Sequence, residues 1–355
     1  MRRPQIERCH NALRLATAFC IVLCVWLLYI ERPLLFPLIV LPPLQRPLPL
    51  DDSPVDIEAL VESWDPFSCN CQRDVSTFND QRRYLFMLSD LSKREWITAT
   101  KLAVMTLQMT CPRYGISVLW NSLIDRQHPN ISSVEKAWFE SRGVEIVRVL
   151  PRKVDPVRYN YIKLHVWEMV EYEMVALYDA DMIFLHSPDS VFDACVQTGA
   201  SFCAVRELLS DRVLLRFRKD LWWRFWQWFV PDQQLRQLKF KSFNAGAFVT
   251  RPNPNVAAHL FRRWVEGYKS NERAHLISEQ LMLNHEITEV GWLSSTYNLQ
   301  KASTVDQLRL GLWRTGMEDF PITVHRKYFS LGATYLRLLL LEAQRHSSCI
   351  LPITL

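Results

Sequence analysis

Strand-like and helix-like segments alternate along the middle of the chain, and this alternation limits the fold more than any other feature. Short apolar runs of strand length are separated by segments with helical spacing. The predicted strands are 84–88, 116–120, 145–149, 174–177, 201–205 and 247–250, and the predicted helices are 96–109, 132–142, 162–170 and 255–269. Strands that alternate with helices form parallel sheets covered on both faces. The sequence therefore predicts an α/β domain with a doubly wound, mostly parallel sheet.

Two aspartates, Asp179 and Asp181, follow the fourth of these strands. In open α/β sheets ligands bind at the C-terminal edge of the strands, and the strand would deliver both carboxylates there. Carboxylates are hard oxygen ligands that suit Mg²⁺ or Mn²⁺, and such ions usually also take oxygens from a substrate phosphate. Asp-x-Asp is also typical of an ordinary solvated turn, so its interpretation depends on the rest of the chain.

Composition places the chain among globular proteins. Its 355 residues are 49% hydrophobic, which is enough for a substantial core. The net charge of +5 is modest, and the basic residues form no long run that would mark a nucleic-acid groove. We therefore expect no nucleic-acid partner.

The N-terminal residues have the pattern of a membrane anchor. Arginines precede an uncharged apolar run over 15–30, which predicts a cytosolic N-terminus and a luminal remainder. A cleaved signal peptide is the alternative, although no small-x-small cleavage site follows the run. Either interpretation takes the chain into the secretory pathway. The expected divisions are a cytosolic tail (1–14), a transmembrane signal anchor (15–32), a Pro-rich stem (33–80), a globular catalytic domain (81–335) and a C-terminal segment (336–355).

The cysteines beyond the predicted anchor fit an oxidising compartment. They are even in number: Cys69, Cys71, Cys111, Cys195, Cys203 and Cys349. One to three disulfides are expected, with the pairing left open by the sequence. Buried free thiols are the alternative. Asn130-Ile131-Ser132 is a glycosylation sequon, as a luminal surface would carry.

An aromatic segment over 221–229 has two possible explanations. Trp222, Phe225, Trp226 and Phe229 share one helical face, which is the usual pattern of core packing. Trp223 and Trp228 lie off that face, so a platform for a sugar or lipid acceptor, or contact with a membrane interface, is the other explanation.

Four sequence blocks resemble, in the same order, the motifs of the glycogenin-like glycosyltransferases of family 8. The central block is Tyr159-Asn160-Tyr161-Ile162-Lys163-Leu164-His165-Val166-Trp167 with Tyr178-Asp179-Ala180-Asp181-Met182-Ile183. Asn244-Ala245-Gly246 and Glu279-Gln280 resemble two later motifs, and His325 resembles a histidine near the end of the family's domain. The resemblance implies a GT-A type, Rossmann-like fold and a retaining transferase that uses a UDP-sugar.

The resemblance also implies roles for single residues. Asp179 and Asp181 would bind Mn²⁺ on the donor diphosphate, with His325 as the third ligand. Lys163 would face the same cleft, where an ammonium neutralises phosphate or holds a sugar hydroxyl. The implied catalytic residues are Lys163, Asp179, Asp181, Glu279 and Gln280. The implied donor-binding residues are Leu88, Asp90, Trp96, Asn160, Lys163, Asn244 and Gly246.

Two departures from the family pattern suggest a second function class. Glu279 stands where the family has aspartate, and His325 lacks the Lys-Pro-Trp segment that follows it in the family. A membrane-tethered nucleotide-sugar-binding or carbohydrate-binding protein without activity is therefore the alternative. The first expectation is a hexosyl or glucuronosyl transferase of the Golgi or ER membrane. Its acceptor would be a carbohydrate, a glycoprotein or a glycolipid.

Overall fold

The computed structural model describes the chain in several stretches. They are residues 55–69, 71, 81–88, 94–122, 129–150, 159–207, 242–269, 279–300, 321–325, 331, 333–345, 347 and 349. The predicted anchor, the segment 221–229, Asp90 and the side chains of Asn130 and Asn160 lie outside the described residues. Among the helices in these stretches, none has both the length and the apolar character that a bilayer span requires.

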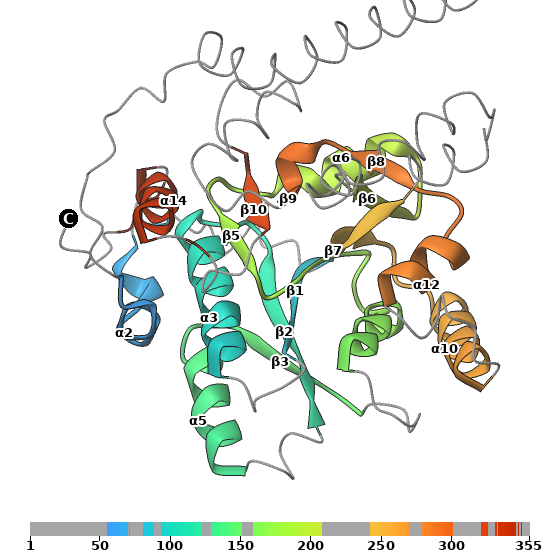
Figure 1. The fold of residues 1–355 in the computed structure, drawn as a ribbon, viewed down its shortest axis with the longest axis horizontal. Coiled ribbons are helices and arrows are strands. Elements are labelled where there is room, and N and C mark those ends of the chain that lie inside the picture. Colours follow the sequence, from blue (N-terminus) through green and yellow to red (C-terminus); the bar gives the residue numbers. More distant parts are fainter. Residues whose placement is uncertain are drawn as a thin grey trace, which may run out of the picture.

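A seven-stranded sheet in the order β3-β2-β1-β4-β7-β6-β8 forms the centre of the molecule (Figure 1). Its strands are β1 (Arg82–Leu88), β2 (Gly115–Asn121), β3 (Glu145–Val149), β4 (Met174–Tyr178), β6 (Phe202–Arg206), β7 (Phe243–Thr250) and β8 (Gly291–Leu293). Every strand of this sheet runs in the same direction except β7, which is antiparallel to both β4 and β6. The mainly parallel α/β architecture is confirmed, with β7 as the reversed strand.

A three-stranded sheet lies at the end of β4. It contains β5 (Met182–Phe184), β10 (Thr323–His325) and β9 (Leu299–Gln300), with β10 in the middle. β10 is antiparallel to β5 and parallel to β9. Because β5 begins directly after Asp181, this small sheet brings a late segment of the chain against the aspartate pair.

Helices cover both faces of the large sheet, as Figure 1 shows. They are α2 (Ile57–Glu62), η1 (Pro66–Ser68), α3 (Arg94–Met109), α5 (Pro129–Glu140), η3 (Tyr159–Glu168), α6 (Ser190–Thr198), α10 (Pro254–Lys269), α12 (Glu279–Glu286), η4 (Ser295–Tyr297) and α14 (Ala333–Arg345). One hydrophobic core includes side chains of α2, α3, α5, α6 and α14, and a second includes those of η3, α10 and α12. The sheet separates the two cores.

Alternate residues of the central strands point into opposite cores. In β4, Met174, Ala176 and Tyr178 lie in the first core, whereas Val175 and Leu177 lie in the second. Successive side chains of a strand point to opposite faces, so a strand buried on both faces is apolar throughout. This explains why β4 has no polar residue until the sheet ends and Asp179 follows.

Some predicted boundaries are wrong. The helix expected over 132–142 begins at Pro129 and ends at Glu140. Proline is favourable at the start of a helix because its missing N–H has no acceptor to reach there. The strand expected over 247–250 begins earlier, at Phe243, so Asn244, Ala245 and Gly246 lie within β7. The 162–170 segment forms η3, a 3₁₀ helix that starts at Tyr159.

Part of the predicted stem belongs to the folded domain. Ile57, Leu60, Val61 and Trp64 are buried in the first core, so 57–64 is no extended linker. The apolar spacing of α2 explains this, because it gives the helix a buried face. At the other end, the expected boundary at residue 335 falls inside α14, whose leucines pack in the same core. Both ends of the described chain therefore contribute to the domain.

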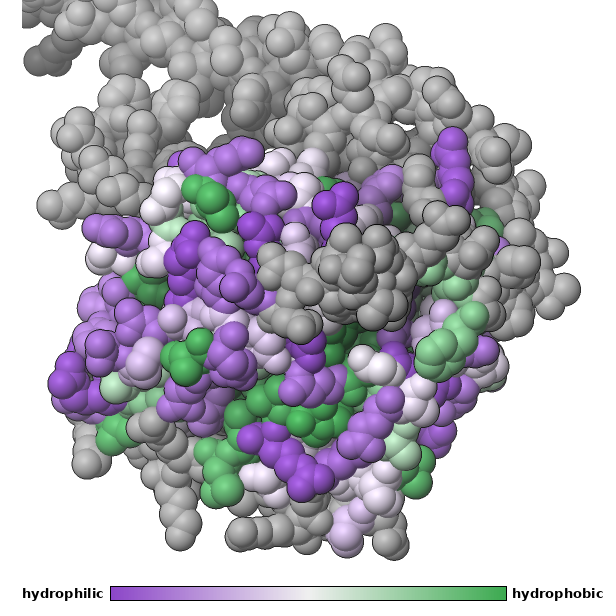
Figure 2. Space-filling model, turned by 180° about the vertical axis from the view of Figure 1, so that it is seen from behind, coloured by the Kyte–Doolittle hydropathy of each residue, from purple (hydrophilic) through white to green (hydrophobic). Residues whose placement is uncertain are grey.

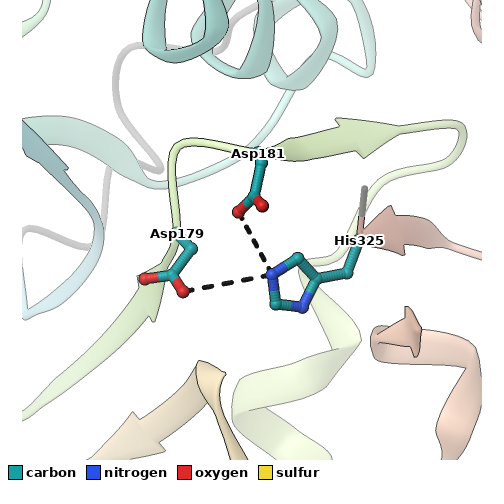
Figure 3. Close-up of side chains that lie close together, drawn as sticks. All are labelled: Asp179, Asp181 and His325. Carbon is teal, nitrogen blue, oxygen red and sulfur yellow. Dashed lines mark hydrogen bonds and ion pairs between the residues drawn. The ribbon is translucent and has the colours of Figure 1, made fainter. Parts of the chain in front are cut away.

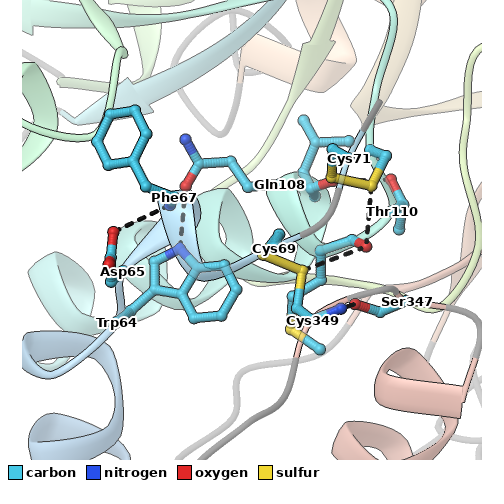
Figure 4. Close-up of a disulfide and its surroundings, with 12 residues drawn as sticks. Trp64, Asp65, Phe67, Cys69, Cys71, Gln108, Thr110, Ser347 and Cys349 are labelled. Carbon is cyan, nitrogen blue, oxygen red and sulfur yellow. Dashed lines mark hydrogen bonds between the residues drawn. A yellow bond between two sulfur atoms is a disulfide. The ribbon is translucent and has the colours of Figure 1, made fainter. Parts of the chain in front are cut away.

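The cysteines expected to be luminal are paired. The disulfides are Cys69–Cys349, Cys71–Cys111 and Cys195–Cys203. The first joins segments 280 residues apart, and Figure 4 shows it near Trp64, whose Nε1 donates to Gln108 Oε1 at 3.1 Å. The disulfide interpretation of these cysteines is confirmed over free thiols.

The surface in Figure 2 mixes hydrophilic and hydrophobic side chains, with one hydrophobic group near the middle of this face. The large exposed apolar side chains come from different elements or the residues next to them: Phe67, Val134, Leu150, Val170, Val196 and Leu281. Single exposed apolar residues are normal on a globular protein and call for no partner.

A polar contact fixes α12 against α10. Glu286, whose side chain is 8% exposed, accepts hydrogen bonds from His259, Arg263 and His285 at 2.9, 3.0 and 2.9 Å. Burial alone would raise the pKa of Glu286, but these hydrogen bonds and the Arg263 charge lower it to about 2. The contact holds α12, and thereby Glu279 and Gln280, in place.

We expect Glu286→Gln to lower the free energy of unfolding by about 1–2 kcal/mol at neutral pH, because the charge that binds three donors is lost. A glutamate with a lowered folded pKa stabilises the fold above its unfolded pKa of about 4.3, and this contribution is lost as the pH falls towards about 2. Urea unfolding of the natural protein and of Glu286→Gln should show that their difference in free energy of unfolding shrinks as the pH falls from about 4.3 towards about 2. Glu266→Gln, which removes a 52% exposed partner of Arg263, is the control and should have little effect.

Candidate functional site

Asp179 and Asp181 lie on the short turn that connects the two sheets. β4 ends at Tyr178 in the large sheet and β5 begins at Met182 in the small one. The Asp179 N–H donates to the carbonyl of Gly246 at 2.7 Å, which continues the β4–β7 pairing by one residue. Both side chains remain partly accessible, with 23% and 14% of their surface exposed. The carboxylates therefore stand at the C-terminal edge of β4, as expected from the sequence.

The small sheet places His325 opposite this turn. His325 is the register partner of Met182, the residue that follows Asp181. Its Nε2 lies 3.1 Å from Asp181 Oδ1 and 3.9 Å from Asp179 Oδ2. Figure 3 shows the three side chains pointing towards one another from the end of β4, the turn and β10. The structure thus brings together the three residues that the resemblance implied as metal ligands.

Gly246 leaves the space in which these side chains meet. Because β7 is reversed, its first residues lie at the C-terminal edge of β4, next to the aspartates. A Cβ at Gly246 would overlap the His325 ring and would lie 2.9 Å from both Asp179 Oδ2 and Asn244 Oδ1. Glycine is needed here because side chains approach the backbone closely. This reason applies within a strand as well as in a turn.

Lys163 is buried beside the same carboxylates, with 2% of its side chain exposed. Its Nζ contacts Asp179 Oδ1 at 2.8 Å, Glu279 Oε1 at 3.0 Å and the carbonyl of Ala245 at 3.2 Å. Two of these contacts, to Glu279 and to the Ala245 carbonyl, are hydrogen bonds, and the contact with Asp179 is an ion pair. In this geometry Lys163 positions Asp179 and Glu279.

Side chains of α12 hold the start of β7. Gln280 Oε1 accepts from the Ala245 N–H at 3.0 Å. Asn284 Oδ1 accepts from the Phe243 N–H at 2.7 Å, and its Nδ2 donates to the Phe243 carbonyl at 2.9 Å. These side chains bond backbone groups of Phe243 and Ala245, as a neighbouring strand would do. Glu279 and Gln280 therefore lie at the site and are bonded to groups of the protein.

The other expected donor-binding residues lie apart from these contacts. Leu88 ends β1 at the same edge of the sheet, two positions beyond Phe86, the register partner of Tyr178. Its side chain is buried in the first core, so only its backbone faces that edge. Trp96 is partly exposed in the first turn of α3. Asp90 and the side chain of Asn160 are outside the described residues.

One residue at the site gave no signal in the sequence. Asn298 is fully buried, and its side chain contacts His325 Nδ1 and Asn244 Oδ1, each at 3.1 Å. It lies between η4 and β9, where a single polar residue between Tyr297 and Leu299 forms no pattern. Only the pairing of β9 with β10 reveals that this residue lies beside a predicted ligand.

The ionisable groups of the site shift one another's pKa values. Burial would lower the pKa of His325, but the hydrogen bond and charge of Asp181 raise it above its usual value. Burial would raise the pKa of Asp181, yet His325 lowers it below the usual range. Burial and the Asp181 charge raise the pKa of Asp179, against the opposing charge of Lys163. Burial would lower the pKa of Lys163, but Asp179 and Glu279 raise it.

The donor set fits a divalent metal ion. Asp179, Asp181 and His325 each offer one ligand atom, and these atoms all lie within 4.8 Å of one another. Two carboxylate oxygens and one imidazole nitrogen suit ions such as Mn²⁺. The space next to Gly246 would hold no side chain without displacing a ligand. The residues present are therefore compatible with a metal ion held by all three.

Comparison with known proteins gives no match to a family model or to a curated protein. Among solved structures, similar chains are glycosyltransferases. The glycosyltransferase GlyE of Streptococcus pneumoniae TIGR4 is 14% identical, with a TM-score of 0.46 over 75% of this chain and 60% of that one. Mouse xyloside xylosyltransferase 1 is 11% identical, with a TM-score of 0.43 over 69% and 97%. The bifunctional glycosyltransferase WbbM is 13% identical, with a TM-score of 0.43 over 75% and 50%. With scores this low, we draw no conclusion from the likeness.

We expect Gly246→Ala to weaken binding of a divalent metal ion, with Mn²⁺ as the probe, at least about tenfold, because the added methyl group displaces His325 and the Asp179 carboxylate. Electron paramagnetic resonance of free Mn²⁺ measures the affinity. The control is Gly115→Ala, in the same sheet, whose added methyl group meets only the flexible end of Arg83. Equal Mn²⁺ affinity in Gly246→Ala and the natural protein would contradict the site described here.

Proposed function

We propose that the protein is a retaining glycosyltransferase that moves a hexosyl or glucuronosyl group from a UDP-sugar to a carbohydrate, glycoprotein or glycolipid acceptor, with Mn²⁺ at Asp179, Asp181 and His325. The observation that carries this proposal is the convergence of these three side chains at the C-terminal edge of β4. Ligands of open α/β sheets bind at that edge. Elsewhere in the described part of the chain no comparable group of His, Cys, Asp and Glu occurs.

The bound ion would offset the negative charge that grows on the diphosphate as the glycosyl bond breaks. Asp179 and Asp181 would hold it from one side of the gap and His325 from the other. The ligands come from two sheets that meet at one turn, so the positions of the ligand atoms follow from backbone pairing. Such preorganised ligands need little rearrangement when the donor binds.

Lys163 would act on the reaction through Asp179. Its ammonium fixes one oxygen of Asp179 at 2.8 Å, which leaves the other oxygen, Oδ2, directed towards His325. The same ammonium fixes Glu279 at 3.0 Å, and burial of the pair excludes water from that side. The expected direct contact of Lys163 with phosphate would compete with the two carboxylates for the ammonium.

The acceptor would attack the donor sugar on the same face of the ring from which UDP departs. This would account for retention of the anomeric configuration. The leaving phosphate oxygen would accept the acceptor's proton, so no pair of carboxylates is needed as acid and base. Glu279 fits this scheme as a positioning group, since one of its oxygens is already bound to Lys163.

The proposal includes a place in the secretory pathway, with the domain in the lumen of the Golgi or ER and anchored by 15–32. Three disulfides support an oxidising compartment, because such bonds are rare in the cytosol. The basic and apolar N-terminal sequence supports the anchor.

We expect the full-length protein to release UDP from at least one UDP-sugar of glucose, galactose, glucuronic acid, xylose or N-acetylglucosamine, and only with a divalent metal. Asp181→Asn should reduce turnover at least about a hundredfold, because removal of an electrostatic stabiliser of the leaving group typically costs that much. A coupled UDP-release assay with and without Mn²⁺ measures both effects. Asp189→Asn is the control, since Asp189 accepts from Tyr84 outside the metal site.

Two results would contradict the proposal in different ways. Full activity in Asp181→Asn would remove this residue from the mechanism. UDP binding without turnover of any donor would favour the membrane-tethered binding protein over the enzyme.

We expect Lys163→Met to destabilise the protein by about 3–5 kcal/mol, because it leaves the Glu279 carboxylate, 9% exposed, and the partly exposed Asp179 carboxylate without the ammonium. Lys101→Met is a matched control. Lys101 is 3% exposed and also lies between two carboxylates, those of Glu62 and Glu135. Neither of these carboxylates belongs to the candidate metal site. Both variants should unfold at lower urea concentration. In the folded protein only Lys163→Met should reduce turnover, and equal turnover in the two would contradict a positioning role for Lys163.

A further inference from the structure

The orientation of the His325 ring can be traced back to a backbone group whose role is certain. The N–H of Gly246 can only donate, and it lies 2.9 Å from Asn244 Oδ1. An amide side chain can present either oxygen or NH₂, and contacts decide which. Because a backbone N–H faces it, Asn244 presents its oxygen at this position.

The same argument then sets Asn298. Its side chain lies 3.1 Å from Asn244 Oδ1, which is an acceptor, so Asn298 must present Nδ2 there. The other end of its amide, Oδ1, consequently faces His325 Nδ1 at 3.1 Å. Asn298 is 0% exposed, so no water replaces either partner.

An oxygen acceptor beside Nδ1 requires that Nδ1 carry the proton. Without a metal, Nε2 can carry a second proton and donate it to Asp181 Oδ1 at 3.1 Å. That proton leaves when a metal binds, and because Nδ1 keeps its own, the lone pair is then on Nε2, the nitrogen that faces Asp181 and Asp179. Metal-binding histidines commonly donate their second N–H to such an acceptor, which sets the ring orientation and strengthens the ligand.

We propose that Asn298 is a positioning residue that holds His325 in the form whose Nε2 is free to bind a divalent cation, and that Asn244 and the Gly246 N–H set the direction of this hydrogen-bond chain. The proposal rests on the metal site of the proposed function and adds the groups that prepare it. It gives β7 two tasks, since Gly246 makes room for His325 and also starts the chain that orients it.

Binding of Mn²⁺ alone to the full-length protein tests the proposal, with electron paramagnetic resonance of free Mn²⁺ as the readout. Asn298→Leu keeps a similar side-chain size but removes the acceptor, and we expect it to bind Mn²⁺ about 10–100-fold more weakly. Asn298→Asp restores an acceptor for Nδ1–H but removes the donor to Asn244 Oδ1, so its affinity should recover to a value above that of Asn298→Leu. Rescue by aspartate separates an effect on the ligand from simple loss of packing.

A buried amide elsewhere provides the matched control. Gln108 is 3% exposed, accepts from Trp64 Nε1 at 3.1 Å and donates to the Arg142 carbonyl at 2.7 Å. It therefore has one accepted and one donated bond, as Asn298 does towards its neighbours. Gln108→Met should lower the unfolding temperature of the metal-free protein and leave its Mn²⁺ affinity unchanged.

A second measurement needs only the natural protein. With ¹⁵N-labelled histidine and the diamagnetic ion Cd²⁺, the metal should shift the Nε2 resonance of His325 and leave a proton on Nδ1, with His325→Gln used to assign the signal. Cadmium coordination through Nδ1 would overturn the proposal even if Asn298→Leu did not fold.

The outcomes also separate this inference from the proposed function. Asn298→Leu that folds and binds Mn²⁺ as tightly as the natural protein overturns the role of Asn298 and leaves the metal site standing. A natural protein that binds no Mn²⁺ overturns both. Weak binding in Asn298→Leu, rescue in Asn298→Asp and normal binding in Gln108→Met support the inference.

Discussion

The buried ammonium of Lys163 is the interaction on which the arrangement of the site depends. It comes from η3 and contacts Asp179 after β4, Glu279 of α12 and the Ala245 carbonyl of β7. A buried charge without partners is very unfavourable, so each of these contacts is needed by the others. The elements that carry the candidate ligands and the elements that border them therefore share one electrostatic centre. Displacing η3 or α12 would disturb Asp179 although neither element supplies a ligand.

A second constraint comes from the reversed strand. If β7 ran parallel to β4, its C-terminal residues would lie beside the aspartates, and Gly246 would be at the opposite edge of the sheet. The reversal instead brings Gly246 to both Asp179 and His325. Its carbonyl accepts from the Asp179 N–H, its N–H donates to Asn244 Oδ1, and the absence of a side chain leaves room for the His325 ring. Backbone groups do not vary with sequence in the way that side chains do. The site therefore depends on topology as much as on the identity of its carboxylates.

Local patterns predicted what depends on local chemistry. Apolar strand-length runs located β1 to β4, and the end of the apolar run located Asp179 at the sheet edge, because burial on both faces excludes polar residues. Family resemblance named His325, but nothing in its neighbourhood showed that β10 would pair with β5. Asn298 could not be found, because its role comes from contacts with Asn244 and His325, distant in the chain. Lys163 lies beside Asp179, and its contacts with Asp179, Glu279 and the Ala245 carbonyl depend on a tertiary arrangement that spacing does not encode.

The wide separation of the site residues along the chain has a consequence for biosynthesis. His325 follows Asp181 by 144 residues, and Glu279 follows Lys163 by 116. At synthesis rates of about 5–20 residues per second, the aspartates exist for roughly 7–30 s before the histidine is made. During that time the lysine and the two aspartates lack their distant partners and have to remain hydrated. Closure of this region is therefore a late event in the production of each molecule, and an interrupted chain that already contains both aspartates would still present an open, water-filled edge.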